Sequence, residues 1–409
     1  MTAASALSHL DGSLSGRRYD ADALQQTDPE DGRTLLARYD LPAARQTLSH
    51  ESIARQRGLW RWSELLPVRD ARCIVTLGEG GTPLLWARRL GEALGLDRLE
   101  LKAESLNPTG SFKARGMAVA VSRAAELGAT SFVAPSAGNA GGALAAFAAA
   151  AGLPATVVMP ADAPLANQQE VVVCGARLIL LEGLISDCGK LARAISESTG
   201  AFDVATLREP YRVEGKKTLG FELAEDCGWE LPDVVVYPTG GGTGLIGMWK
   251  AWDELEAVGL IAGRRPRLVA VQSDGCAPIV RAFESGAKFA EPWTGAATRA
   301  AGIRVPGALG DHLILDAIRA SRGVALAVPE AEIIPMQKFA SERGAGFVGL
   351  ETAAALASLP VLLERRLVDR RERVVVFDTG AGFKSIAPDV PLPSSIANDA
   401  SAWEPLLAH

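Results

Sequence analysis

From about residue 131 onward, short apolar runs alternate with longer segments whose apolar residues recur at helical spacing. Strands and helices that follow one another in this way are typical of parallel sheets covered by helices on both faces. The predicted strands are 131–135, 155–159, 177–181, 233–237, 267–271 and 373–377, and the predicted helices are 139–151, 165–173, 186–198 and 243–255. These elements fall into two sets, about 111–225 and 226–395, so we expect an α/β fold with two doubly wound parallel-sheet domains.

The first 60 residues lack this alternation. They are polar, rich in Asp, Ser, Arg and Gln, and are interrupted by Pro29, Gly32 and Pro42, which predicts irregular structure. The character changes at Glu79, where a Gly/Pro turn opens an apolar segment. Residues 1–60 are therefore expected to form a small N-terminal extension, and no repeat of fixed period is visible along the chain.

Composition narrows the class of protein. The 409 residues are 48% hydrophobic and 22% charged, as expected for compact α/β proteins, and the net charge of −6 without a long basic cluster argues against nucleic acid or an anionic membrane as partners. Five cysteines are scattered without a CxxC pair, which favours a reducing compartment and disfavours a cysteine-held metal. Neither a signal peptide nor an apolar run long enough to cross a bilayer is visible, so a cytoplasmic enzyme is expected.

The first candidate for chemistry is Lys113. It follows two turn-forming pairs, Asn107-Pro108 and Thr109-Gly110, and precedes an apolar helical run. Apolar surroundings, a nearby Arg115 and a helix N-terminus all disfavour the ammonium form of a lysine. A neutral lysine amine forms Schiff bases with carbonyl compounds, including pyridoxal phosphate. An exposed lysine after a turn is the structural alternative.

Three loops follow predicted strands, where open parallel sheets bind ligands. The loop 135–142, Pro-Ser-Ala-Gly-Asn-Ala-Gly-Gly, offers backbone N–H groups and a hydroxyl to a carboxylate, or else serves as a tight packing turn. The loop 238–244, Pro-Thr-Gly-Gly-Gly-Thr-Gly, predicts phosphate binding at a helix N-terminus, although it is neither a Walker A loop nor a dinucleotide fingerprint. Thr379, after the last strand, offers a hydroxyl that either hydrogen-bonds a buried ring nitrogen or caps a helix.

These features occur in the order found in fold type II pyridoxal-phosphate enzymes, which the chain resembles, and within that group it is most similar to the threonine synthase family. The matching motifs span about residues 75–390 and are Glu79-Gly-Gly-Thr-Pro-Leu84, Asn107-Pro-Thr-Gly-Ser-Phe-Lys113, Ser136-Ala-Gly-Asn139, Glu214-Gly-Lys-Lys-Thr218, Thr239-Gly-Gly-Gly-Thr-Gly244 and Thr379-Gly-Ala-Gly-Phe-Lys384.

The resemblance implies a tryptophan synthase β-like fold. Its larger, pyridoxal-phosphate-binding domain would comprise 61–110 plus 226–395, its smaller, mobile domain 111–225, and its C-terminal tail 396–409. A homodimer and a small amino-acid substrate, phosphorylated or not, are implied as well. Closure of the two domains on the substrate is expected, because a carbanionic intermediate must be kept from water.

The resemblance also implies roles for individual residues. Lys113 is expected to form the Schiff base with the cofactor and then to move the Cα proton of the substrate, with Phe112 beside the ring. Thr379 would meet the pyridine nitrogen, with Asp378 as the rival partner; a neutral hydroxyl there suits elimination and replacement better than transamination. The remaining expected contacts are Asn139 to the cofactor's 3-oxygen, Gly240, Gly241, Gly242 and Thr243 to its phosphate, and Ser136, Ala137, Gly138, Asn139, Ala140 and Arg212 to the substrate.

The N-terminal extension resembles the zinc ribbon that heads some threonine-synthase-like proteins. The positions of its four cysteines are occupied here by Gly12, Ser15, Asp28 and Asp31. Glycine has no ligating side chain and serine is a poor zinc ligand, so we expect no structural metal. A remnant held by packing, or a mobile arm, is expected instead.

The chain departs from the threonine synthase pattern where that family binds the substrate phosphate. Ala140 and Leu207 replace hydroxyl residues, and Glu209 replaces an asparagine, whereas Arg212 remains. Arg208 and Lys216 are additional cations that could rebuild an anion site, and Ala114 replaces the aspartate usual after the lysine.

Three functions remain open. The first is a threonine synthase, which converts O-phospho-L-homoserine and water to L-threonine and phosphate. The second is a β-eliminating or β-replacing enzyme, such as a serine/threonine dehydratase or a biosynthetic tailoring enzyme. The third is a non-catalytic ligand-binding paralogue, which the intact Lys113 and glycine loops disfavour. The four histidines fall outside every candidate loop, so a Ser-His-Asp triad has little support.

Overall fold

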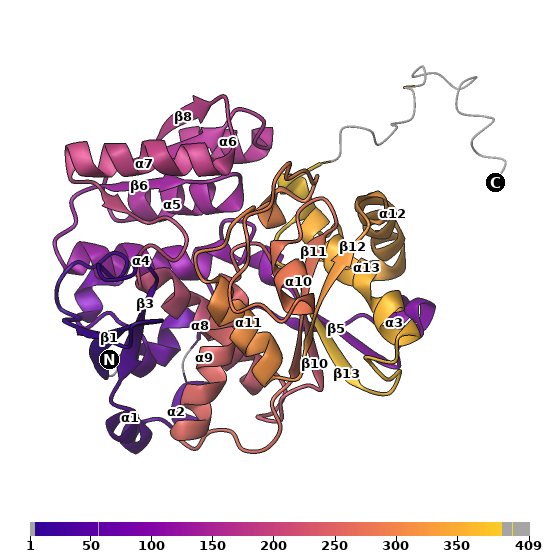
Figure 1. Ribbon diagram of the computed structural model, residues 1–409. Helices are drawn as coiled ribbons and strands as arrows, with labels where there is room; N and C mark the ends of the chain where they lie inside the picture. The colour runs from indigo at the N-terminus through magenta and orange to yellow at the C-terminus, as the bar shows by residue number, and fades with distance from the viewer. Residues whose placement is uncertain (1–4, 56, 387–394, 396–409) are drawn as a thin grey trace, which may run out of the picture.

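The computed structural model describes residues 5–55, 57–386 and 395 of the chain. The predicted tail 396–409, and residues 387–394 of the predicted larger domain, lie outside the described residues. Three sheets organise the described part, with six, four and three strands (Figure 1). The two larger sheets confirm the predicted α/β class.

The six-stranded sheet has the order β12-β11-β10-β13-β5-β4. Its strands are β4 (Leu84–Trp86), β5 (Arg98–Lys102), β10 (Val234–Pro238), β11 (Arg267–Ser273), β12 (Val324–Val328) and β13 (Arg373–Phe377). All neighbours are parallel except β4, which pairs antiparallel with β5 at the edge. β10 is a continuous run of buried residues, as expected for a central strand covered on both faces.

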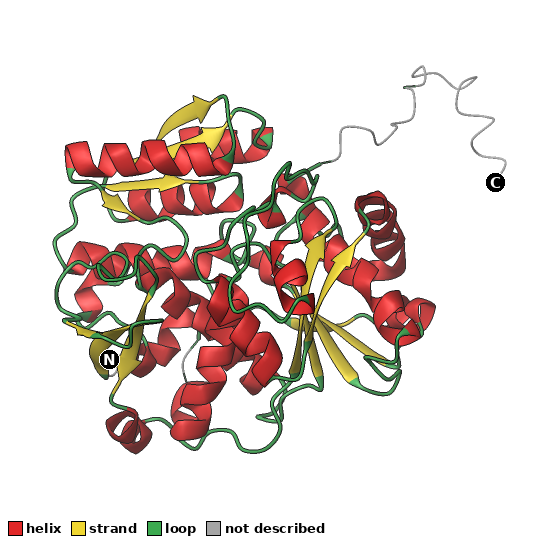
Figure 2. Ribbon diagram, viewed as in Figure 1, coloured by secondary structure: helices red, strands yellow, loops and turns green. Residues whose placement is uncertain are grey.

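Helices cover both faces of this sheet (Figure 2). One face carries α3 (Arg88–Leu94), α12 (Glu330–Ala340) and α13 (Leu350–Glu364), and the other carries α9 (Thr243–Ala257), α10 (Pro278–Glu284) and α11 (Asp311–Ala320). Short 3₁₀ or π segments cover Leu59–Leu65, Ala71–Cys73, Glu104–Leu106, Ala301–Ile303, Ser341–Ala345 and Gly382–Lys384.

The four-stranded sheet is wholly parallel, with the order β8-β7-β6-β9. It consists of β6 (Phe132–Pro135), β7 (Ala155–Pro160), β8 (Arg177–Leu181) and β9 (Phe202–Asp203), with helices α5 (Asn139–Ala150), α6 (Leu165–Val173) and α7 (Ile185–Thr199). Val133 and Val158 pack against Cys188 and Ala192 of α7 in a small separate core.

Two buried helices, α4 (Lys113–Glu126) and α8 (Tyr211–Asp226), lie between the two large sheets (Figure 1). They approach closely because glycines face each other: a Cβ on Gly215 would lie 2.7 Å from the Cα of Gly116. The crossing is further held by Arg115, whose guanidinium pairs with Glu104 and with Glu222, each at 2.6 Å and fully buried. The start of α4 is thereby held in one position relative to α8.

The N-terminal extension is not irregular, and the prediction of irregular structure is wrong. β1 (Leu7–Gly12), β2 (Arg18–Tyr19) and β3 (Leu35–Tyr39) form an antiparallel sheet, followed by α1 (Leu41–Thr47) and α2 (His50–Ala54). Tyr39 donates a 2.8 Å hydrogen bond to Glu214 of α8, inside a buried cluster with Lys217, Lys250 and Glu254. These strands are not apparent in the sequence because only a few apolar residues, such as Leu10 and Leu35, form the face that packs against the core.

Three of the four positions that correspond to zinc-ribbon cysteines, Gly12, Ser15 and Asp28, lie close together. Ser15 Oγ donates to Asp28 at 2.5 Å, and a Cβ on Gly12 would lie 2.0 Å from the same carboxylate oxygen. Tyr19 donates to the other oxygen of Asp28. A hydrogen-bonded carboxylate therefore occupies the centre of this turn, and no group of three or more potential metal ligands is found in the described part of the chain.

Candidate active site

Lys113 is the first residue of α4. The turn before it is closed by a 2.8 Å hydrogen bond from Gly110 N to the Asn107 carbonyl, and Gly110 has a φ of +64°, a conformation that favours glycine. The amine Nζ lies 4.2 Å from the centre of the Phe112 ring. The predicted bend and helix are confirmed, although the helix starts at Lys113 itself.

The surroundings of Lys113 favour its neutral amine. Burial, followed by the positive charge of Arg212, lowers the pKa of Lys113 from 10.5 to about 7, and the carboxylate of Glu351 opposes this shift. Glu351 lies in the first turn of α13, and no motif in the sequence points to it. Near neutral pH a substantial fraction of the amine is therefore unprotonated and nucleophilic.

Lys216 contacts the backbone of Phe112 and Lys113. Its amine donates to the backbone carbonyls of Phe112, at 2.7 Å, and Lys113, at 3.1 Å, and lies 4.7 Å from the Phe112 ring centre. Burial, with neighbouring cations, holds the pKa of Lys216 well below its usual value. Two hydrogen bonds of this amine therefore hold the start of α4.

The loop 135–142 connects β6 to α5. Ser136 Oγ accepts from Gly141 N at 2.8 Å and donates to the Gly138 carbonyl, so its hydroxyl shapes the loop itself. Asn139 opens α5, and its Oδ1 is buried without a hydrogen-bond partner among the described residues. Its Nδ2 lies 3.1 Å from where a Cβ on Gly380 would stand. Asn139 therefore faces the loop after β13, with an acceptor free for a ligand. Ala137 and Ala140 are half-buried beside it.

The glycine loop lies between β10 and α9. Gly242 has a φ of +71°. A Cβ on Gly240 would lie 2.7 Å from the Gly302 carbonyl oxygen, and one on Gly242 would lie 2.2 Å from Ile314, so larger residues do not fit. α9 begins at Thr243, and the first N–H groups of a helix have no acceptor within the helix. The loop thus forms a cradle suited to a phosphate.

The loop after β13 adjoins the turn before Lys113. Ser111 and Gly380 form an isolated bridge, and Phe112 N donates to the Thr379 carbonyl at 3.1 Å. Asp378 accepts hydrogen bonds from Ser105 on one oxygen and from Thr352, at 2.8 Å, on the other. Burial raises the pKa of Asp378 to about 6. Both oxygens of Asp378 thus already accept hydrogen bonds from neighbouring hydroxyls.

Arg212 lies in the first turn of α8 and is buried. Its Nη1 donates to the Val204 carbonyl at 2.7 Å, whereas its Nε has no hydrogen-bond partner in the described structure. Glu209 does not pair with the guanidinium; its carboxylate accepts from the backbone N–H groups of Tyr211 and Arg212 and so caps α8. A buried guanidinium with an unused donor fits an anion.

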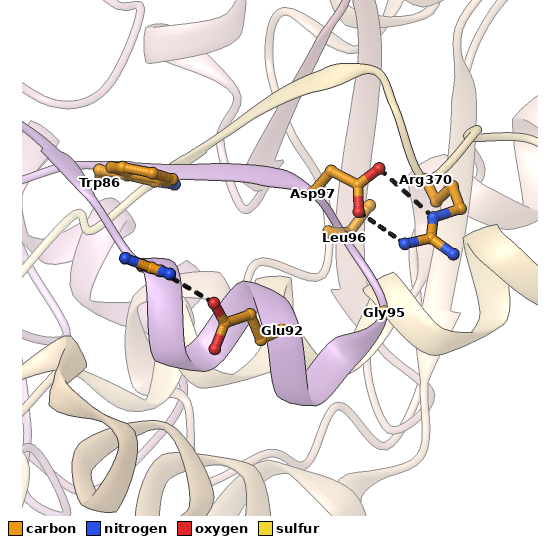
Figure 3. A pocket seen from close by; sticks show the side chains of 7 residues that line it. Trp86, Glu92, Gly95, Leu96, Asp97 and Arg370 are labelled. Carbon is orange, nitrogen blue, oxygen red and sulfur yellow. Dashed lines mark hydrogen bonds and ion pairs between the residues drawn. The ribbon is translucent and has the colours of Figure 1, made fainter.

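Away from these residues, a hollow of 420 Å³ opens at the β4 edge of the six-stranded sheet (Figure 3). It is lined by Trp86, Arg88, Glu92, Gly95, Leu96, Asp97 and Arg370. Its charged residues pair with one another, Arg88 with Glu92 and Arg370 with Asp97. No helix in the described part of the chain is long and apolar enough to cross a membrane.

Residues 75–380 match the family model described as pyridoxal-phosphate dependent enzyme. The chain is 36% identical to a threonine synthase from Methanocaldococcus jannaschii over 93% of both chains, and 37% identical to one from Methanosarcina acetivorans over 79% of both. Among solved structures, maize serine racemase superposes with a TM-score of 0.64 at 21% identity, covering 80% of this chain and 91% of that one.

The chain belongs to the pyridoxal-phosphate-dependent enzymes of fold type II. Within that family its sequence is similar to threonine synthases across most of its length, as the motifs implied. The residues present fit the cofactor: a glycine cradle opens a helix, the Asn139 oxygen is unpartnered, and the amine of Lys113 has a lowered pKa.

Proposed function

We propose that this enzyme is a threonine synthase, which converts O-phospho-L-homoserine and water to L-threonine and phosphate. The main support is that a lysine with a lowered pKa lies near a buried arginine that can bind an anion. The positive charge of Arg212 lowers the pKa of Lys113, and the buried Nε of Arg212 has no hydrogen-bond partner in the described structure. Similarity to threonine synthases over nearly the whole chain supports it.

The residues take the following roles in this proposal. Lys113 binds the cofactor covalently and, once released by the substrate, accepts and returns the Cα proton, for which a pKa of about 7 is well matched. Bound pyridoxal phosphate supplies an electron sink for the negative charge left at Cα. Phe112 would flank the ring, Thr379 would hydrogen-bond its nitrogen, and Asn139 would hydrogen-bond its 3-oxygen. Gly240, Gly241, Gly242 and Thr243 would hold the phosphate of the cofactor, and residues 136–140 would hold the substrate carboxylate.

Arg212 binds the phosphate of the substrate. Its guanidinium is rigid and buried, so it holds the leaving group without a large loss of side-chain entropy on binding. Arg208 is half-buried and close to Arg212 in sequence, whereas Lys216 already donates to two backbone carbonyls.

A second candidate is β-elimination from serine or threonine. The positions of the missing phosphate donors favour it, because Leu207 offers no hydroxyl and the carboxylate of Glu209 is turned to the backbone of α8. A phosphorylated substrate would then be unnecessary.

The deciding experiment supplies each substrate to the purified enzyme. Threonine synthase activity releases phosphate and threonine from O-phospho-L-homoserine, whereas a dehydratase releases a keto acid from serine or threonine. Lys113→Ala abolishes either activity and the visible absorbance of the covalently bound cofactor. Arg212→Met weakens binding of the phosphorylated substrate and leaves cofactor absorbance in place. Keto-acid release without phosphate release would replace the proposal by its alternative.

The same proposal includes a cytoplasmic homodimer whose smaller domain closes over the substrate. Free thiols at all five cysteines support a reducing compartment. Closure is supported by two side-chain links across the site: Arg304 with Asp162, and Lys384 with Glu170.

A further inference from the structure

The N-terminal sheet, residues 7–39, contacts several parts of the chain, and one of them adjoins the candidate site. That segment, 203–211, joins β9 to α8. Gln26 Nε2 donates to the Asp203 carbonyl at 3.1 Å, and Thr34 Oγ1 donates to the Leu207 carbonyl at 3.0 Å. The Thr34 bond is buried at both ends.

Leu207, which receives the Thr34 hydrogen bond, has an unusual backbone. Its φ is +62°, a left-handed conformation that side chains with a Cβ rarely adopt. Its side chain is 1% exposed and packs so tightly on the chain around residue 310 that a Cβ on Gly310 would lie 2.6 Å from its Cδ1. Such a conformation persists only where the surroundings hold it, and it is found preferentially at functional sites.

The segment adjoins the candidate site on either side of Leu207. On one side of Leu207, Thr206 lies against the glycine loop, since a Cβ on Gly241 would be 3.0 Å from its Cγ2. On the other side, Glu209 caps α8 and Arg212 presents its unpartnered Nε. Leu207 therefore lies between a residue that contacts the glycine loop and the start of the helix that carries Arg212.

We propose that the N-terminal sheet positions the substrate-binding segment, and that Thr34 is a positioning residue: its hydroxyl holds Leu207 in the left-handed conformation and thereby holds Arg212 for the substrate phosphate. The last step depends on the proposed role of Arg212. The N-terminal sheet thus supports the candidate site through the buried hydrogen bond from Thr34.

Arg33 provides a matched control. It neighbours Thr34 and also joins the N-terminal sheet to the large domain, but its guanidinium binds Asp311 at 2.8 Å and the Leu309 carbonyl at 2.9 Å, not the segment 203–211. Loss of either side chain weakens the attachment of the sheet, whereas only loss of Thr34 frees the Leu207 carbonyl.

The experiment compares Thr34→Val, Thr34→Ser and Arg33→Gln as holoenzymes. Hydrogen exchange of the peptide covering 203–211 is measured first, because it needs no substrate. Thr34→Val is expected to raise that exchange and to raise KM for O-phospho-L-homoserine about tenfold, the equivalent of one buried hydrogen bond, with kcat and cofactor absorbance unchanged. Thr34→Ser keeps a hydroxyl and is expected to behave as the unmodified enzyme, as is Arg33→Gln.

Unchanged exchange in Thr34→Val overturns the proposal, and so does an equal effect of Arg33→Gln, which would mean that attachment of the sheet alone matters. If Thr34→Val does not fold, Gln26→Leu takes its place, since it removes a half-buried hydrogen bond to the same segment and is expected to raise the same exchange. If the unmodified enzyme does not turn over O-phospho-L-homoserine, the proposed function fails while the exchange measurement still decides the role of Thr34.

Discussion

Gly215 of α8 lies directly against the backbone of Arg115 in α4: a Cβ on Gly215 would stand 2.1 Å from the Arg115 carbonyl oxygen. This contact positions the helix that begins at Lys113. Because neither backbone can move without disturbing the buried ion pairs of Arg115, the site tolerates no side chain at 215.

Gly215→Ala is therefore expected to destabilise the protein by about 3 kcal/mol, as overpacking does in a rigid core. Gly189 is the matched control, since it is also helical but has nothing within 4 Å of an added Cβ. Gly189→Ala is expected to stabilise by about 0.5–1 kcal/mol through helix propensity. Urea unfolding of both variants checks the difference; equal effects would contradict the close contact of α4 with α8.

Burial and two charged neighbours, one positive and one negative, determine the pKa of Lys113. Burial and Arg212 lower it to about 7, while Glu351 raises it. Uptake of pyridoxal phosphate by the cofactor-free enzyme requires the neutral amine, so its rate is expected to rise as the pH increases through about 7. Arg212→Met is expected to move this midpoint up and Glu351→Gln to move it down. Shifts in the same direction for both variants would show that charge is not the cause.

Burial of Glu209 makes the free energy of unfolding depend on pH. Burial, opposed by Arg212 and two backbone hydrogen bonds, raises its pKa from 4.5 to about 7. The native protein then holds a proton that the unfolded chain releases, so this group's stabilisation is present below pH 4.5 and is lost as the pH rises to about 7. Its size is about 3 kcal/mol. Glu209→Gln is expected to remove this part of the pH dependence, measured by chemical unfolding at pH values across the window. An unchanged slope in the variant would assign the proton elsewhere.

Two links across the site are expected to favour the closed arrangement. Arg304 binds Asp162 with both terminal nitrogens, and Lys384 binds Glu170. Surface pairs of this kind contribute up to about 1 kcal/mol each, so the double variant Arg304→Gln/Lys384→Met is expected to raise hydrogen exchange in α6 about tenfold. Lys190→Met, which breaks an ion pair with Asp187 within α7, serves as control and is expected to leave α6 unchanged.

The elements that the sequence predicted best are those whose pattern is local. The helix predicted at 165–173 is observed as α6 with the same bounds, and the strand predicted at 373–377 is β13. The irregular structure predicted for 1–60 was wrong, because the strands there are held by contacts with α8 and α9, such as the bond from Tyr39 to Glu214, which no local pattern records.

The candidate site shows the same division. Lys113, Asn139 and the glycine loop stand out in the sequence because turns, glycines and helix starts leave local marks. Glu351, the two carbonyl bonds of Lys216 and the hydrogen bond from Thr34 to Leu207 leave none, since each joins residues about a hundred or more positions apart.

The sequence alone determined which backbone segments turn or begin a helix, because these properties depend on neighbouring residues and on glycine. Only the tertiary structure decided which charges surround the amine of Lys113 and which side chains contact the segment 203–211. Those depend on burial and on distances of a few ångströms between residues far apart in the chain, and these distances follow from how the helices and sheets pack together.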